Sequence, residues 1–178
     1  WAPFVDNYNI PLITNYFGQR KSWLLVTQIF LIFSIICLGL SNPTENLFFT
    51  AFCSLMVATF SANQDIIIDA YRIEILDDSS QGAGAAMTQF GYRVGGILAG
   101  AGALYLREEL SWSYVFGFMA FIIFSLMVLT IFIIPSSPIK KSLKKKKSLI
   151  DPFLEFITRN PGYKILAIIF FIFFFKFG

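Results

Sequence analysis

The chain has 178 residues, of which 56% are hydrophobic and 18% aromatic, with 14 basic against 11 acidic side chains and a mean hydropathy of +0.68. A water-soluble domain of this length carries more charge and less apolar surface, so this composition excludes one. The apolar residues run continuously instead of alternating, which predicts an all-α, polytopic transmembrane helix bundle. The chain has no histidine, which excludes catalytic triads that use histidine and metal sites with histidine ligands. We expect neither a metal nor a cofactor.

Four complete apolar segments are predicted to cross the membrane as helices, within residues 23–134. They cover residues 23–40, 47–70, 83–106 and 112–134. Residues 1–22 are interpreted as the end of another membrane helix and a loop. Residues 135–164 are interpreted as a basic linker with an amphipathic helix that starts at Asp151, and residues 165–178 as the start of a further membrane helix. We therefore expect a fragment of a longer polytopic protein.

Lysine and arginine are distributed unevenly between the loops, and this distribution predicts the orientation. Arg20 and Lys21 precede the first span, Arg72 follows the second, and six lysines lie between residues 140 and 147 of the linker. The two intervening loops carry only Arg107. The linker is therefore expected in the cytoplasm, with affinity for anionic lipid. No base-stacking aromatic residues accompany the lysines, so we expect no nucleic-acid partner.

The last turns of the second span carry side chains that hydrocarbon tolerates poorly. Asp65, Asp69 and Arg72 are four and three residues apart, so on a helix they form one stripe, and Gln64 precedes Asp65. An ionised side chain at mid-depth costs about 2.5–3.5 kcal/mol, so the stripe is expected to face protein or a wet cavity. For Gln64 and Asp65 we favour a role in proton coupling or in a substrate pathway. For Asp69 and Arg72, pairing at a helix end that meets lipid headgroups stays an open alternative.

Two further cations and a set of glycines lie inside predicted spans. Arg93 either snorkels to the interface, meets Asp65 or holds an anionic solute. Lys176 lies near mid-depth in the last segment and is interpreted as functional. Small-xxx-small spacing predicts close helix packing at Gly91 with Gly95 and at Gly96 with Gly100.

Five runs of residues share an order with one known family. The runs are Trp1–Asp6, Gly18–Leu25, Gln64–Arg72, Gln81–Ala86 and Gly91–Gly95. In this order the chain resembles the muropeptide permeases of the AmpG type, in the major facilitator superfamily. The second run is also similar to the signature loop of that superfamily, which clamps helix ends across the bundle in one state of transport. The resemblance thus implies a conformational loop formed by Asp6, Gly18, Arg20, Lys21 and Arg72.

The resemblance implies a partial major-facilitator fold in a bacterial inner membrane, with these spans as the third to sixth helices of the first half. Such permeases are thought to bring anhydromuropeptides, the sugar–peptide breakdown products of the cell wall, into the cytoplasm with a proton. Asp65 and Asp69 then become the polar or proton-coupling positions, with Arg93 as their neighbour. Expected partners are the lipid bilayer, protons, a small sugar–peptide solute and the remainder of the permease.

Three alternatives stay open. The sister family of acetyl-coenzyme A transporters shares the Trp-Ala-Pro and Arg-Lys-Ser-Trp features. A membrane-embedded enzyme would have only aspartates to use, and Asp65 with Asp69 resembles neither a metal cage nor an acid–base pair. We therefore expect a transporter and not an enzyme. The third alternative is a fragment of such a permease that has no activity by itself.

Overall fold

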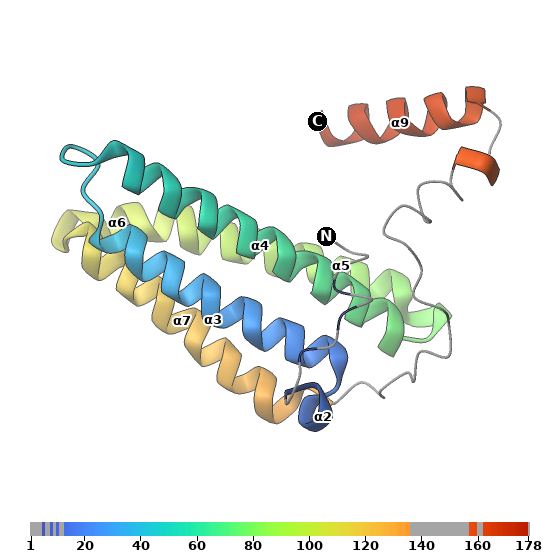
Figure 1. Ribbon diagram of the computed structural model, residues 1–178, viewed down its shortest axis with the longest axis horizontal. Helices are drawn as coiled ribbons and strands as arrows, with labels where there is room; N and C mark the ends of the chain where they lie inside the picture. Colours follow the sequence, from blue (N-terminus) through green and yellow to red (C-terminus); the bar gives the residue numbers. More distant parts are fainter. Residues whose placement is uncertain are drawn as a thin grey trace.

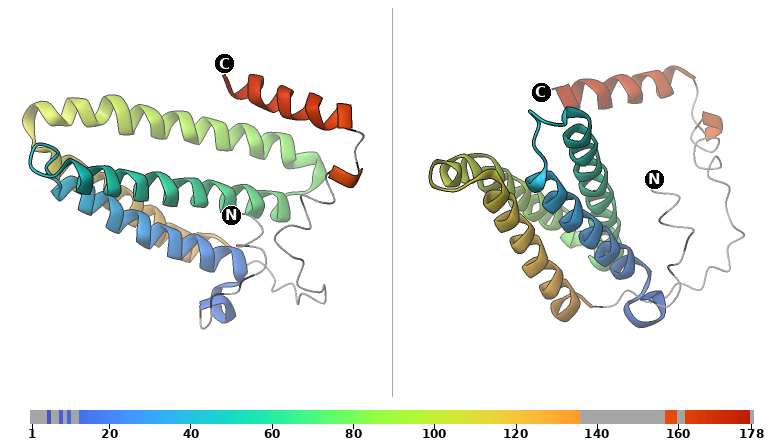
Figure 2. Two further views of the ribbon diagram at one scale, coloured as in Figure 1. Left: turned by 45° about the horizontal axis from the view of Figure 1, so that its top comes forward. Right: turned by 60° about the vertical axis from the view of Figure 1, so that its left-hand side comes forward.

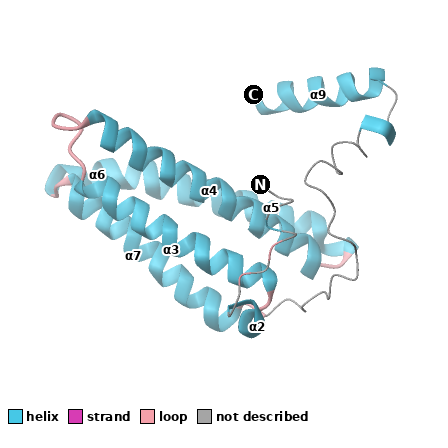
Figure 3. Cartoon of the chain, in the orientation of Figure 1, coloured by secondary structure: helices cyan, strands magenta, loops and turns pink. Residues whose placement is uncertain are grey.

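The computed structural model describes residues 5, 8, 10, 13–135, 157–159 and 162–177, with the backbone alone at 172 and 175–177. Every regular element in this part of the chain is a helix (Figure 3). In chain order the helices are α2 (Ile13–Phe17), α3 (Gln19–Leu40), α4 (Leu47–Ile75), the 3₁₀ turn η1 (Asp78–Ser80), α5 (Gln81–Ile97), the π-helical turn η2 (Leu98–Gly102), α6 (Ala103–Glu109), α7 (Trp112–Ile133) and α9 (Gly162–Phe177). The all-α prediction is confirmed.

Helix α3 is the centre of the bundle, with α4 on one side and α7 on the other (Figure 1). Its apolar stripe includes Leu24, which packs with Ile67 of α4, and Leu31, which packs in a cluster with Ala120 of α7. The rings of Phe30 and Phe60 stack at 5.2 Å between centroids. Spacing of three and four residues along α3 therefore buries one face against two antiparallel neighbours.

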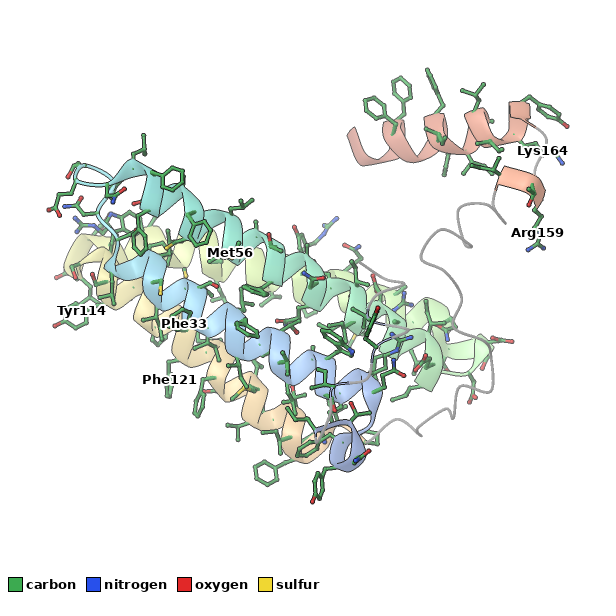
Figure 4. The ribbon with its side chains drawn as sticks, viewed as in Figure 1. Phe33, Met56, Tyr114, Phe121, Arg159 and Lys164 are labelled. Atoms are coloured by element: carbon green, nitrogen blue, oxygen red, sulfur yellow. The ribbon has the colours of Figure 1, made fainter. Side chains whose placement is uncertain are left out.

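Most large apolar side chains point outward from this bundle. Phe33 and Phe121, for example, are 66% and 63% exposed and project away from the helices (Figure 4). A surface of this kind is unfavourable in water and favourable in lipid. Helices α3, α4 and α7 are each long and apolar enough to cross a membrane, and each contains an 18-residue stretch with a mean hydropathy of 2.4, 1.3 and 2.6, respectively.

The predicted third span differs from these three helices. It falls on α5, η2 and α6, which run without a break from Gln81 to Glu109 and so extend about 40 Å. The interruption lies in a glycine-rich stretch, where the backbone lacks side chains that would stabilise a regular α-helix. Since α5 and α6 are each short, four complete spans stay a prediction.

The predicted loop before the first span is partly helical. It contains α2, and Gln19, Arg20 and Lys21 form the first turn of α3. Gly18 precedes that turn with a φ of 78°, a conformation that a side chain would strain. Hydropathy marks where a chain enters lipid, not where helical hydrogen bonding starts, so the helix begins earlier than the apolar segment.

Helix α9 lies apart from the bundle (Figure 2). It starts at Gly162, three residues before the apolar segment that was predicted to begin near residue 165. The amphipathic helix predicted from Asp151 lies outside the described residues except for residues 157–159, which are helical. Lysines 140–147 also lie outside them.

Candidate functional site

An open cavity of about 780 Å³ lies between α4 and α5. Helix α4 lines it with Asp65, Ile68, Asp69 and Arg72, and α5 lines it with a second set that includes Ala85, Thr88, Gln89 and Tyr92. Both sets follow the i, i+3, i+4, i+7 spacing of one helix face. One face of α4 and one face of α5, each with polar and apolar side chains, therefore lie opposite each other across this space, which we call the α4–α5 cavity.

The two helices are pinned together at the turn that joins them. The Gln81 amide donates to the carbonyls of Leu76 at 2.7 Å and Ile73 at 3.3 Å, so it satisfies the last carbonyls of α4. Arg72 donates to the Gln81 carbonyl at 3.3 Å. A Cβ on Gly84 would clash with the end of the Leu76 side chain, so a larger residue there would force that side chain to move. This turn sets the register of the cavity walls.

Within the predicted stripe, the pairing of Asp69 and Arg72 is present. Arg72 Nη2 lies 3.4 Å from Asp69 Oδ1, and the Asp69 side chain is 57% exposed. The Nε of Arg72 is buried and has no hydrogen-bond partner among the described residues. Asp65 lines the same cavity, so the structure brings Asp65, Asp69 and Arg72 together on one wall.

Gln64 is not among the described residues that line the α4–α5 cavity. Its Oε1 is buried and accepts no hydrogen bond from any described residue. Gln28 on α3, which is 4% exposed, also has an Oε1 without a donor. Gln28 lies on the same face of α3 as Leu24 and Leu31. It was not predicted as a candidate site residue, although a glutamine among the apolar residues of one helix face can be recognised from the sequence.

Arg93 is exposed on α5 and forms no hydrogen bond or ion pair with Asp65. It is also not among the described residues that line the cavity. Gly91, Gly95, Gly96 and Gly100 have no described atom within 4 Å of a Cβ position, so their predicted close packing is not found within the described part of the chain. Lys176 lies in α9, where the structure gives only its backbone.

A second polar cluster holds the helix ends near the start of α3. Lys21 is 4% exposed, and its Nζ donates to the carbonyls of Ile131 at 2.8 Å and Ile134 at 2.9 Å, at the C-terminus of α7. A cation is stabilised there by the helix dipole. Arg20 Nη2 lies 3.0 Å from Glu74 Oε1 near the end of α4. The Tyr71 hydroxyl donates to the Pro135 carbonyl at 2.9 Å.

We call Arg20, Lys21, Tyr71 and Glu74 the helix-end clamp. Arg20 and Lys21 were predicted members of a conformational loop, and they contact two helices other than their own. Asp6 lies outside the described residues, and Arg72 belongs to the cavity wall instead. Glu74 and Tyr71 were not predicted. An acidic residue near the end of one span and an arginine at the start of its antiparallel neighbour lie on the same side of the membrane, so the sequence could have indicated this ion pair.

Removing the pair of Arg20 and Glu74 is expected to reveal a modest coupling. The two side chains are 13% and 26% exposed, so their attraction is partly screened by solvent. A double-mutant cycle of Arg20→Gln and Glu74→Gln should give a coupling free energy of about 1 kcal/mol between the two side chains. The free energies of unfolding are measured by denaturation in detergent. The same cycle on Asp69 and Arg72, a more exposed pair one turn apart, should give less than half of this coupling. Equal couplings would contradict the assignment of Arg20 and Glu74 to a clamp.

The three membrane-length helices define the class: a multi-pass membrane protein, here with an open cavity beside α4. The profile of the Major Facilitator Superfamily matches residues 10–178, and the chain belongs to this superfamily. Membership indicates a transporter and disfavours the alternative of a membrane-embedded enzyme. The partial major-facilitator fold predicted from sequence is thereby confirmed.

Relatives include proteins named for one kind of cargo. The anhydromuropeptide permease of Escherichia coli (strain K12) is 33% identical over 173 residues, covering 95% of this chain and 34% of the permease. AmpG 4 of Rickettsia felis, named as a transporter, is 36% identical over 185 residues, covering 96% and 43%. AmpG 3 of Rickettsia typhi is 35% identical over 187 residues, covering 99% and 44%. The predicted resemblance to AmpG-type permeases is confirmed.

The chain spans less than half the length of these relatives. No solved structure matches it.

Proposed function

We propose that the chain is part of a secondary active transporter that imports anhydromuropeptides together with protons. The observation that carries this proposal is the α4–α5 cavity, where Asp65 and Asp69 lie on a membrane-length helix. Ionisable groups at such positions are characteristic of proton relays and solute pathways. The names of the relatives supply the cargo class.

The proposed mechanism is the rocking of two helical halves around a site between them. A carboxyl group favours its protonated form when it is desolvated and its ionised form beside a cation or water. Changing the hydration of Asp65 as the cavity opens and closes therefore couples proton binding to the state of the carrier. The helix-end clamp would hold the ends of α3, α4 and α7 together in one of these states.

The membrane orientation follows from the positive-inside rule. The helix-end clamp carries Arg20 and Lys21, and Lys21 contacts the C-terminus of α7, which the basic linker follows in the sequence. We place this side in the cytoplasm and the chain in the bacterial inner membrane. The α4–α5 cavity then belongs to the cytoplasmic half of the pathway.

A chimera tests the function directly. This chain replaces the matched segment of the E. coli permease, and uptake of labelled anhydromuropeptide is measured in cells that lack their own permease. The chimera is expected to restore uptake. A chimera that reaches the membrane in normal amounts but takes up no label would refute the proposal.

Asp65→Asn in this chimera is expected to lower proton-driven uptake at least about tenfold, which corresponds to about 1.4 kcal/mol of barrier. Asparagine keeps the shape of the side chain but carries no titratable proton. Asp77→Asn, a change in the exposed turn after α4, serves as the matched control and should leave uptake unchanged. Undiminished proton-driven uptake by Asp65→Asn would remove the coupling role.

A further inference from the structure

The walls of the α4–α5 cavity differ in chemistry. Helix α4 contributes the two carboxylates and Arg72, whereas the wall from α5 carries no charge. Its polar and aromatic members are Thr88, Gln89 and Tyr92, which stand among the apolar or small residues Ala85, Met87 and Gly91. Tyr92 is 72% exposed. The side chains of Gln89 and Tyr92 donate no hydrogen bond to any other described residue. The Thr88 hydroxyl already donates to the Gly84 carbonyl at 2.9 Å, so Gln89 and Tyr92 are the side chains of this face that can donate to a solute.

The pinned turn places these groups at matching levels. Arg72 lies against the Gly84 position, where a Cβ would be 3.4 Å from Arg72 Cδ. Asp65 is two helical turns from Arg72 on α4, and Tyr92 is two turns from Gly84 on the antiparallel α5, so each lies about 11 Å from that contact. Asp69 and Thr88 are each about one turn from it. The Tyr92 ring thus lies level with one carboxylate, and the hydroxyl and amide lie level with the other.

An aromatic ring opposite carboxylates is suited to a neutral ring that has C–H groups on its face and hydroxyl or amide groups on its edge. The apolar face packs on the aromatic ring, and the edge groups donate to carboxylate oxygens, which together offer several acceptor positions. The cavity is poorly suited to bind a phosphate group, because the guanidinium of Arg72 already donates to Asp69 and to the Gln81 carbonyl. The cavity volume is in the range of small-molecule sites.

Building on the proposed function, we propose that the α4–α5 cavity binds the sugar part of the cargo, with its ring stacked on Tyr92 and its hydroxyl and amide groups bonded by Asp65, Asp69 and Gln89. The peptide part then lies outside this cavity. Tyr92 is a specificity-determining residue that recognises the sugar.

Binding to the full chain in lipid nanodiscs tests this assignment separately from transport. The probes are labelled anhydromuropeptide, its sugar part alone and its peptide part alone. The sugar part is expected to bind saturably and to displace the labelled probe, whereas the peptide part is not. Tyr92→Leu should raise the Kd of the sugar part about tenfold, whereas Tyr92→Phe, which keeps the ring, should raise it about threefold or less.

Tyr105→Leu is the matched control, since Tyr105 is 74% exposed and lines a different, apolar cavity formed largely by α6 and α7. This variant should bind the sugar part as the unaltered chain does. Unchanged affinity in Tyr92→Leu, displacement by the peptide part alone, or no saturable binding of the sugar part would each overturn the assignment. Failure of uptake by the chimera, with Tyr92-dependent sugar binding intact, would instead remove the transport function.

Discussion

Replacing Lys21 with methionine is expected to lower the free energy of unfolding by about 3 kcal/mol, because two partly buried hydrogen bonds from a charged donor are lost. Its Nζ donates to the carbonyls of Ile131 and Ile134 and lies 5.1 Å from the centre of the Phe17 ring. Methionine keeps an unbranched apolar stem, so the loss isolates the ammonium group. Chemical denaturation in detergent, followed by circular dichroism, measures the change.

Lys164→Met removes an exposed lysine at the start of α9 and should change the free energy of unfolding by less than about 0.5 kcal/mol. If Lys21→Met costs no more than this control, the Lys21 ammonium does not hold the end of α7. A loss of the expected size shows that Lys21 stabilises the fold, in addition to its predicted role in the conformational loop. In that case, uptake measurements on Lys21 variants would need correction for the amount of folded protein.

Replacing Gly39 with leucine is expected to lower the free energy of unfolding by about 3 kcal/mol through overpacking. A Cβ at Gly39 would lie 2.7 Å from Phe116 Cβ, and that atom, next to the α7 backbone, cannot rotate away. The Gly39 carbonyl also accepts a hydrogen bond from Ser113 Oγ at 2.7 Å, which separation of the helices would break. Thermal unfolding in detergent provides the measurement.

Gly117→Leu offers a control of opposite sign. Gly117 lies within α7 and has no described atom within 4 Å of its Cβ position. Leucine is favoured over glycine in a helix by about 0.8 kcal/mol, so this variant should be as stable as the unaltered chain or slightly more. Similar losses in both variants would show that leucine, and not the close approach of α3 and α7, is responsible.

Sequence alone determined the class of the protein, the approximate positions of α3, α4 and α7, and the superfamily. These features follow from long apolar segments and short local motifs, which can be recognised from the order of residues along the chain. Helices α3 and α4 extend beyond the first and second predicted spans. Helix α4, predicted to end at residue 70, continues to Ile75, because charged residues leave the hydrocarbon without interrupting the helix.

Only the tertiary structure decided which polar groups share a site. Gln64 and Asp65 are adjacent in sequence but point about 100° apart on α4, so the cavity includes Asp65 and leaves Gln64 out. Likewise the partners of Lys21 lie more than a hundred residues away, at the end of α7. Hydropathy shows that a segment enters the membrane. The rotation of each helix about its axis and the angle at which helices cross depend on packing between segments, and they determine the surroundings of each charged side chain.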